Sequence, residues 1–214
     1  MDDISGRILD YIVANRMSTT EIADALYKTG ELNPKLKPII QGIRAVGFVE
    51  YVLASNNSNY NLHEQIKDVQ KNKIILADSI NCDKALFGEL VAKYLSLYKS
   101  ANGIIAMGLL RDAKNLIKDK YPIWCFDFSP IGCHNGKVDY DFDYYKKLKK
   151  YYDDSIIVAD DGGVIIIHKN QLTEETYDRL VFIEQQEDEW FNCIDYYKMN
   201  TFDTVCLGKR KGVV

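Results

Sequence analysis

Two short segments of this sequence carry residue types that can hold an anion and a metal ion. The first contains Gly88 and Glu89, and the second contains Arg111 followed directly by Asp112. Glycine lets a ligand come close to the backbone, arginine offers a planar fork to a carboxylate or phosphate, and aspartate is a hard oxygen ligand suited to Mg²⁺. Together these residues predict a site that holds an anionic keto acid against a divalent cation.

A purely structural role for the same residues stays open at this point. Arg111 and Asp112 could pair with each other, or Asp112 could cap a helix, and an Arg-Asp dipeptide alone is not specific. The elements around the two segments therefore carry part of the argument.

Strand and helix signals alternate through the middle of the chain. Short apolar runs predict strands over Ile74–Ala77, Gly103–Met107 and Pro122–Phe126, with helices over Ala85–Tyr98 and Asp112–Lys120 between them. This spacing indicates parallel strands joined by right-handed crossovers. Ligands collect beyond the carboxyl ends of such strands, where helix N-termini favour anions. Both segments follow a strand, so we expect them to meet at one edge of the sheet.

The flanking regions predict further elements of an α/β chain. Ser18 and Glu21 form the pattern of a capping box. The expected elements are helices over 4–15, Thr19–Lys28, Leu62–Val69 and Leu172–Trp190, a strand over Gly47–Ala54, and a hairpin of Ser155–Ala159 with Val164–His168. No linker, repeat or low-complexity tract interrupts the sequence. We therefore expect one domain over residues 1–214, with an N-terminal helical extension and a C-terminal helix.

Composition narrows the class of protein. The 214 residues are 47% hydrophobic and 27% charged, as in ordinary globular proteins. The net charge is −4, and aspartates flank the one dense lysine cluster (146–150), so we expect no direct nucleic-acid partner. Apolar runs such as Gly103–Leu110 are too short to span a bilayer, and the first residues are acidic where a signal peptide is basic. We expect a cytoplasmic protein without membrane contacts.

Cysteines and histidines do not have the spacing of a zinc site. The five cysteines include no CxxC pair, and the three histidines are scattered, which favours reduced thiols. Cys133 and His134 are adjacent, but adjacent side chains rarely face each other as a nucleophile and base would need to. No histidine lies near either candidate segment in sequence, so we expect a metal-bound water to move the proton. No glycine-rich cofactor loop follows the first strand, so a methyltransferase role has no support.

The segment 85–130, ALFGELVAKYLSLYKSANGIIAMGLLRDAKNLIKDKYPIWCFDFSP, resembles the core of the RraA-like family. That family includes the regulator of RNase E activity and the 4-hydroxy-4-methyl-2-oxoglutarate aldolases. STTEIADALYKTG (18–30) and SIIVADDGGVIII (155–167) extend the likeness over most of residues 18–190. The resemblance implies a layered β/β/α swivelling-domain fold, like the phosphohistidine domain, assembled as homotrimers or hexamers.

The aldolases of that family are class II enzymes, and the resemblance implies roles for matching residues here. Arg111 would bind the pyruvyl carboxylate and keto oxygen, and Asp112 would ligate Mg²⁺ or Mn²⁺. A glutamate from the C-terminal region of a neighbouring subunit completes some family sites, and Glu187 is the candidate, with Glu184 and Glu189 as alternatives. Backbone contacts to the carboxylate would come from Gly88, Glu89, Leu90 and Val91.

Two regions depart from the family pattern. The aldolases usually carry an acidic residue three positions after the aspartate, where this chain has Asn115. Asp112 and Asn115 share a helix face, so a neutral amide there should weaken metal binding. Residues 138–154 are rich in Tyr and Lys and are atypical, and we expect a helix there that either reshapes the pocket or a subunit contact, or forms a surface insertion.

Three functions remain open. The first is a divalent-metal-dependent lyase, an aldolase or decarboxylase, acting on a pyruvate-containing or other 2-oxo acid. The second is a non-catalytic regulatory protein that resembles the regulator of RNase E activity. The third is a divergent lyase or isomerase of sugar or polysaccharide metabolism. Arg111 and Asp112 favour an enzyme, and Asn115 favours the regulatory protein.

Overall fold

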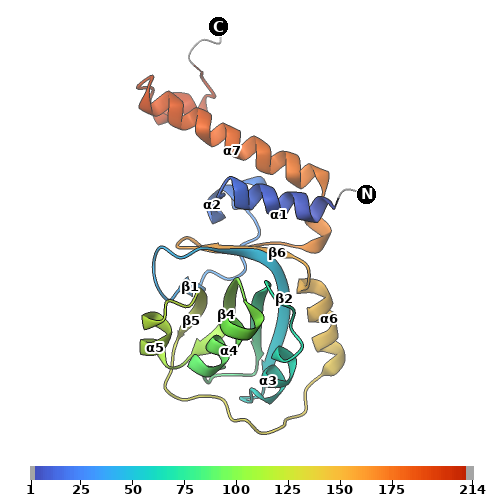
Figure 1. Ribbon diagram of the computed structural model, residues 1–214. Helices are drawn as coiled ribbons and strands as arrows, with labels where there is room; N and C mark the ends of the chain where they lie inside the picture. Colours follow the sequence, from blue (N-terminus) through green and yellow to red (C-terminus); the bar gives the residue numbers. More distant parts are fainter. Residues whose placement is uncertain (1–2, 211–214) are drawn as a thin grey trace.

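A seven-stranded mixed sheet organises residues 3–210, the part of the chain that the computed structural model describes (Figure 1). Its strand order is β1-β5-β4-β3-β2-β6-β7. Strands β2 to β5 run parallel, whereas β1, β6 and β7 pair antiparallel with their neighbours. The strands are β1 (Lys37–Pro38), β2 (Ala45–Ser55), β3 (Ile74–Ile80), β4 (Gly103–Leu110), β5 (Ile123–Phe128), β6 (Ile156–Asp160) and β7 (Gly163–Ile167).

Helices cover the strands on two sides. The helices are α1 (Ile4–Ala14), α2 (Thr19–Ala25), α3 (Tyr60–Ile66), α4 (Glu89–Lys99), α5 (Ala113–Lys118), α6 (Phe142–Tyr152) and α7 (Glu174–Asp195), with a 3₁₀ turn η1 (Lys169–Gln171) and a π-helical turn η2 (Phe202–Cys206). Within residues 3–210, none of these helices has both the length and the hydropathy that a membrane crossing requires.

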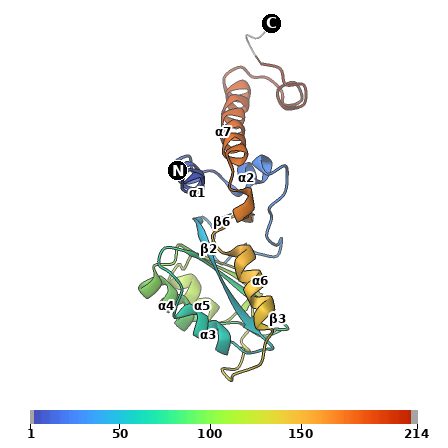
Figure 2. The same ribbon diagram turned by 90° about the vertical axis from the view of Figure 1, so that its right-hand side faces the viewer.

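Strand β2 belongs to two layers. Its first four residues, Ala45–Phe48, pair antiparallel with β6, and the next seven, Val49–Ser55, pair parallel with β3. The β6–β7 hairpin therefore continues from one end of β2 while β3 to β5 continue from the other. Figure 2 shows β2 as the long strand that rises from the lower layer toward the hairpin.

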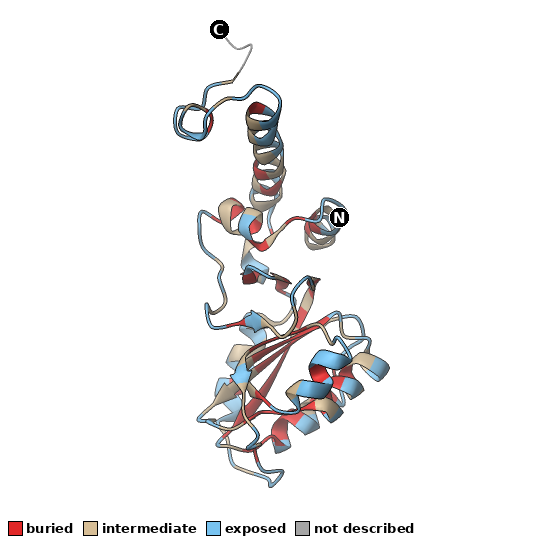
Figure 3. Ribbon diagram, turned by 90° about the vertical axis from the view of Figure 1, so that its left-hand side faces the viewer, coloured by how far each residue is buried: buried red, intermediate tan, exposed pale blue. Residues whose placement is uncertain are grey.

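Three buried apolar clusters separate four layers. One cluster lies between the helices α3 to α5 and one face of β2–β5, and includes Leu62 and Val91. The second lies between the other face and the hairpin, and includes the fully buried Trp124. The third packs α1, α2 and α7 on the outer face of the hairpin, around Ile8 and Leu180. The buried residues follow the strands and the inner sides of the helices (Figure 3). The predicted layered α/β fold is confirmed.

The hairpin shows why its sequence is apolar without a polar alternation. Ile157 and Ala159 enter the middle cluster, whereas Ile156 and Val158 enter the outer cluster. Both faces of a strand between two layers are buried, so both sets of side chains are apolar.

Most predicted elements are confirmed, with two corrections near the candidate site. The parallel strands, the hairpin and the Ser18–Glu21 capping box form as expected. The helix predicted over Ala85–Tyr98 begins only at Glu89, because the residues before Gly88 are extended. The strand predicted to end at Met107 continues to Leu110. Neither β1 nor η2 was expected.

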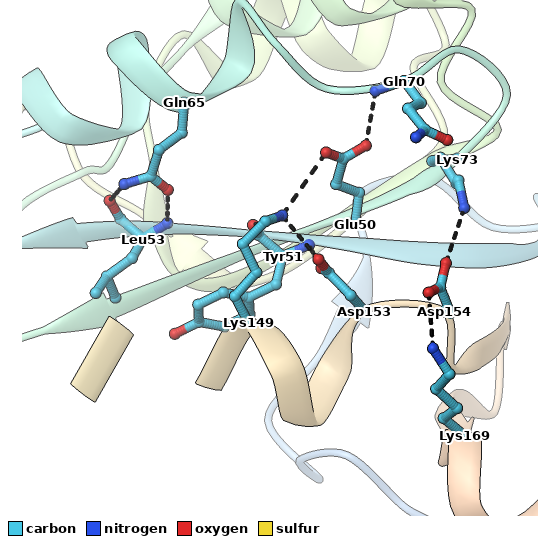
Figure 4. Close-up of polar contacts among 10 residues, drawn as sticks. All are labelled: Glu50, Tyr51, Leu53, Gln65, Gln70, Lys73, Lys149, Asp153, Asp154 and Lys169. Atoms are coloured by element: carbon cyan, nitrogen blue, oxygen red, sulfur yellow. Dashed lines mark hydrogen bonds and ion pairs between the residues drawn. The ribbon is translucent and has the colours of Figure 1, made fainter. Parts of the chain in front are cut away.

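The atypical segment 138–154 contains helix α6, as predicted, and α6 packs beside β2. Tyr51 of β2 stacks on Tyr152, with ring centroids 5.2 Å apart, and Tyr145 is buried in the middle cluster. The Lys149 ammonium lies 2.9 Å from Asp153 Oδ2 and 3.7 Å from Glu50 Oε1. Figure 4 draws the contacts of Lys149 with Asp153 and Glu50. The segment thus covers one side of the middle layer and is not a loose surface insertion.

The Asp153 carboxylate supplies a backbone contact that β2 lacks once β6 has separated from it. Tyr51 N–H donates to Asp153 Oδ1 at 2.8 Å. We predict that Asp153→Ala lowers the free energy of unfolding by about 1–3 kcal/mol, because a buried donor loses its partner. Urea denaturation measures this. Asp143→Ala is the control, because the Asp143 side chain is exposed and makes a long ion pair with Lys146, at 3.8 Å. This variant should change the free energy of unfolding by less than about 0.5 kcal/mol. Equal losses in both variants would contradict this role for Asp153.

Candidate active site

A cavity of about 180 Å³ lies beyond the carboxyl ends of β3 and β4, on the side of α3 and α4. Its lining includes Gly88, Leu90, Val91, Arg111 and Asp112. The structure therefore brings together most of the residues that the sequence predicted to act at one site. Among them, Leu90 is largely exposed and Val91 is buried. Glu89 is not in the lining and contributes through its backbone.

An extended stretch, 85–87, fixes the first candidate segment against the second. Leu86 N–H donates to Leu109 O at 2.8 Å, and Arg111 N–H donates to Phe87 O at 3.0 Å. On the other side, Ala85 N–H donates to Ile131 O and Cys133 N–H donates to Ala85 O, each at 2.9 Å. This stretch therefore acts as a short strand between the end of β4 and residues 131–133, and for this reason α4 starts later than predicted.

Gly88 makes room for the Asp112 carboxylate. A Cβ atom at Gly88 would lie 2.0 Å from Asp112 Oδ2 and 2.8 Å from Arg111 Cγ. The sequence predicted a glycine for the close approach of a ligand, but here it permits the close approach of a side chain. Glu89 N–H donates to the same Asp112 Oδ2 at 3.1 Å. The carboxylate therefore sits at the N-terminus of α4, where the helix dipole favours negative charge.

Asp112 and Arg111 form a partly solvated pair. Arg111 Nε lies 3.6 Å from Asp112 Oδ2, and their side chains are 48% and 40% exposed. Asp112 precedes α5 in a left-handed conformation, with φ 60°, and makes no side-chain cap to that helix. The pairing expected as a structural alternative is thus present, and the expected helix cap is made to α4 through Glu89 N–H and not to α5. An ion pair so exposed contributes at most about 1 kcal/mol to the stability of the fold. Both groups can therefore also bind a ligand.

Asn115 turns to a partner that the sequence did not indicate. Its Nδ2 donates to Glu89 Oε2 at 2.6 Å. The Asn115 amide therefore binds the Glu89 carboxylate beside the first turn of α4. The sequence had related this amide only to Asp112.

The residues around Asp112 fit a hydrated divalent cation better than a closed metal cage. Across residues 3–210, no cluster of three or more His, Cys, Asp and Glu side chains is arranged to hold a metal ion. Mg²⁺ commonly retains several waters and takes only one or two carboxylates together with substrate oxygens. Asp112, with a partly exposed carboxylate at the cavity wall, has the donor chemistry for that kind of binding.

Sequence reasoning missed three polar residues of the cavity lining, His63, Asn59 and Asn135, and the first two have environments that bear on function. Burial lowers the pKa of His63 below its usual value of 6.5, so the ring is mostly neutral at pH 7. Asn59 is buried, its Nδ2 donates to Leu86 O at 3.1 Å, and its Oδ1 has no partner among the described residues. An unpartnered acceptor in a cavity wall suits a water or a ligand donor. His63 and Asn59 come from α3 and its N-cap, and only their place before a predicted strand pointed toward this edge.

The three C-terminal glutamates lie away from the cavity of their own chain. Glu184, Glu187 and Glu189 belong to α7, which lies on the opposite side of the layers from α3 and α4 (Figure 1). Glu184 accepts from the Tyr11 hydroxyl and Glu189 accepts from Arg210. Burial, followed by the nearby carboxylates of α2, raises the pKa of Glu187. A role for any of them at a site requires a second copy of the chain.

The close contact at Gly88 gives a stability prediction. We predict that Gly88→Ala lowers the free energy of unfolding by about 1–3 kcal/mol, because the new methyl overlaps the Asp112 carboxylate. Thermal and urea denaturation measure this.

Two variants make that result specific to the contact. Adding Asp112→Ala to Gly88→Ala should restore part of the loss, because it removes the overlapping carboxylate. Gly6→Ala is the matched control, since Gly6 lies in α1 and its nearest neighbour is an Asp3 carboxylate oxygen at 3.2 Å. If Gly88→Ala were as stable as Gly6→Ala, the argument for the glycine would be wrong.

Solved structures share this fold. An uncharacterized protein from Pseudomonas syringae pv. tomato matches with a TM-score of 0.69 and 17% identity, over 93% of this chain and 96% of that chain. RraAS2 from Streptomyces coelicolor, titled an unusual member of the RNase ES inhibitor RraA protein family, matches with a TM-score of 0.66 and 18% identity, over 86% and 96%. The RNA-processing inhibitor RraA from Thermus thermophilis matches with a TM-score of 0.53 and 21% identity, over 71% and 92%.

A family model also covers the elements that build the cavity. Residues 19–166 match the RraA-like model, described as Aldolase/RraA. That range runs from α2 to β7 and so includes α3, the extended stretch, α4 and the Arg111–Asp112 pair. The chain belongs to the RraA-like (Aldolase/RraA) family.

Proposed function

We propose that this protein is a divalent-metal-dependent lyase, an aldolase or decarboxylase, that acts on a pyruvate-containing or other 2-oxo acid. The observation that carries the proposal is the shared cavity of Arg111, Asp112 and the first turn of α4. The Arg111 guanidinium and the N-terminus of α4 suit the negative charge of such a substrate, and the Asp112 carboxylate suits the metal ion.

The substrate carboxylate would bind to Arg111 and to the start of α4. The guanidinium presents a planar fork to a carboxylate. The first-turn amides of a helix precede its internal hydrogen bonds and favour an anion, and Leu90 and Val91 supply those amides at the cavity wall. Glu89 N–H already donates to Asp112, so its role is to position that carboxylate.

Carbon–carbon cleavage next to a keto group moves the bond electrons onto the keto oxygen. A divalent cation held by Asp112, Mg²⁺ or Mn²⁺, would stabilise that developing negative charge. Arg111 would add a second positive group directed at the same region, where negative charge develops.

A proton acceptor is needed for the aldol cleavage, because the substrate hydroxyl must lose its proton as the bond breaks. His63 lies in the cavity lining, and its lowered pKa keeps the ring neutral and able to accept. The same ring can return the proton to the methylene carbon of the pyruvate enolate. We therefore assign proton transfer to His63, where the sequence alone suggested a metal-bound water.

The first test is pyruvate release from oxaloacetate and from 4-hydroxy-4-methyl-2-oxoglutarate, with Mg²⁺ or Mn²⁺ and with EDTA. We predict metal-dependent release by the wild type, abolition by Asp112→Ala, and a loss of about 10²–10³-fold in kcat for Arg111→Ala. Asp119→Ala is the control, because Asp119 is an exposed aspartate at the other end of α5. Undiminished turnover by Arg111→Ala would contradict the proposal.

The role of His63 has its own test. We predict that His63→Gln lowers kcat by about 10²-fold and removes the acidic limb of the pH profile. Protonation prevents His63 from accepting a proton. Wild-type activity should therefore fall as the pH drops through the His63 pKa, which lies below 6.5. His134→Gln, at an exposed histidine outside the lining, should keep the wild-type profile. A limb that persists in His63→Gln would assign proton transfer elsewhere.

A non-catalytic regulatory protein is the second candidate function. Two observations favour it. Asn115, a neutral amide, donates a hydrogen bond to the Glu89 carboxylate, and residues 3–210 contain no group of three or more His, Cys, Asp or Glu side chains arranged to hold a metal ion. Two of the structural neighbours carry titles of RNase or RNA-processing inhibitors. Absence of pyruvate release under all conditions, from a folded protein, would favour this function.

We also propose that the chain assembles as a homotrimer or hexamer. The distal part of α7 and the residues after it expose large apolar side chains, among them Phe191, Tyr196, Phe202 and Leu207. Figure 2 shows this part of the chain standing clear of the sheet layers, where a second copy can reach it.

A further inference from the structure

Two cysteines far apart in sequence meet at the wall of the cavity. Cys133 is in the lining and Cys82 is half-buried behind it, in the same apolar cluster. The two thiols are close enough for each to be the largest influence on the pKa of the other. Cys133 Sγ lies 4.0 Å from Lys84 O, and Cys82 Sγ lies 3.5 Å from Ile80 O. Among the described residues, none of the five cysteines forms a disulfide.

The backbone around each thiol is tied to the other. Cys133 N–H donates to Ala85 O at 2.9 Å, three residues beyond Cys82. Asn57 joins both segments a second time, because Asp83 N–H donates to Asn57 Oδ1 at 2.9 Å and His134 N–H donates to Asn57 O at 3.0 Å. The two thiols are therefore neighbours because two sets of backbone contacts hold them together.

The surroundings divide the roles of the two sulfurs. The interaction with the Cys133 thiol, followed by the backbone amides of Asn57 and Ser58, lowers the pKa of Cys82 to about 7, against the opposing effects of burial and Asp83. The same interaction raises the pKa of Cys133. These opposite shifts favour Cys82 as the thiolate and Cys133 as the protonated partner. By contrast, burial raises the pKa of Cys125 to about 12, which makes that thiol unreactive.

We propose that Cys82 and Cys133 form a redox modification site that hydrogen peroxide converts to an intramolecular disulfide. The Cys82 thiolate attacks one peroxide oxygen, the O–O bond breaks, and hydroxide leaves, so that Cys82 becomes a sulfenic acid. Cys133 sulfur then attacks Cys82 sulfur, the S–O bond breaks, and the released hydroxide takes the Cys133 proton as water. Two thiols lose two electrons in total, and one peroxide becomes two waters.

This modification would act on the candidate site through Gly132. A Cβ atom at Gly132 would lie 3.0 Å from Arg111 Nη1, so the backbone next to Cys133 forms the wall beside the guanidinium. A disulfide draws Cys133 toward Cys82 and changes that wall. The modification itself does not depend on the proposed lyase reaction.

The test uses the full reduced chain treated with hydrogen peroxide, then alkylated under denaturing conditions and analysed by mass spectrometry. We expect two fewer alkylated thiols than the five of the reduced chain, loss of two hydrogens in mass, and a linked peptide pair that contains Cys82 and Cys133. Dithiothreitol should restore all the thiols.

Three variants decide which sulfurs react. Cys82→Ser should leave Cys133 fully alkylated, and Cys133→Ser should stop the reaction at Cys82 sulfenic acid, which dimedone traps. Cys206→Ser removes the exposed thiol and should still give the disulfide. Wild-type protein that shows only a disulfide through Cys206, or sulfinic acid at Cys82 with free Cys133, would overturn the proposal.

Discussion

The continuity of β2 through two layers is the constraint on which the rest of the structure depends. One strand of eleven residues serves β6 over its first part and β3 over its second. The β6–β7 hairpin must therefore leave β2 midway, and the freed edge of β2 needs new hydrogen-bond acceptors. Asp153 accepts from Tyr51 N–H at that place, and α6 fills the adjoining side of the middle layer. The helices α3 to α5 are then confined to the opposite face, and the cavity forms among their ends.

At the cavity the equivalent constraint is steric. The extended stretch 85–87 is hydrogen-bonded on both edges, so Gly88 has no freedom to move away from Asp112. The Asp112 carboxylate occupies the space of a side chain at Gly88 and accepts from Glu89 N–H. One group of atoms thus starts α4, orients the carboxylate and leaves Arg111 partly exposed beside it. The site is preorganised by backbone contacts, and a ligand can bind without first ordering these residues.

Local patterns in the sequence predicted the parallel strands, the hairpin and the edge of the sheet where Arg111 and Asp112 meet, because each is encoded by short-range periodicity and spacing. The start of α4 was placed wrongly. Ala85, Leu86 and Phe87 continue an apolar helical pattern, but pairing with Leu109 and with residues 131–133 overrides it. His63 and the pair of Cys82 with Cys133 were missed for a related reason. Their proximity is created by tertiary contacts, and no spacing along the chain records it.

If the protein binds the cation and the 2-oxo acid that we propose, the charges in the cavity would link the binding of one to the binding of the other. Arg111 and Asp112 largely cancel, His63 is mostly neutral, and Asn115 holds the Glu89 carboxylate outside the lining. An anionic 2-oxo acid therefore gains little net attraction from the protein alone, and a cation gains little from one carboxylate that already faces a guanidinium. Each proposed ligand would supply the charge that the other lacks, and the increase in affinity would have to be the same in both directions. A neutral amide at position 115 would thus shift metal recognition from the protein toward the complex of protein and substrate.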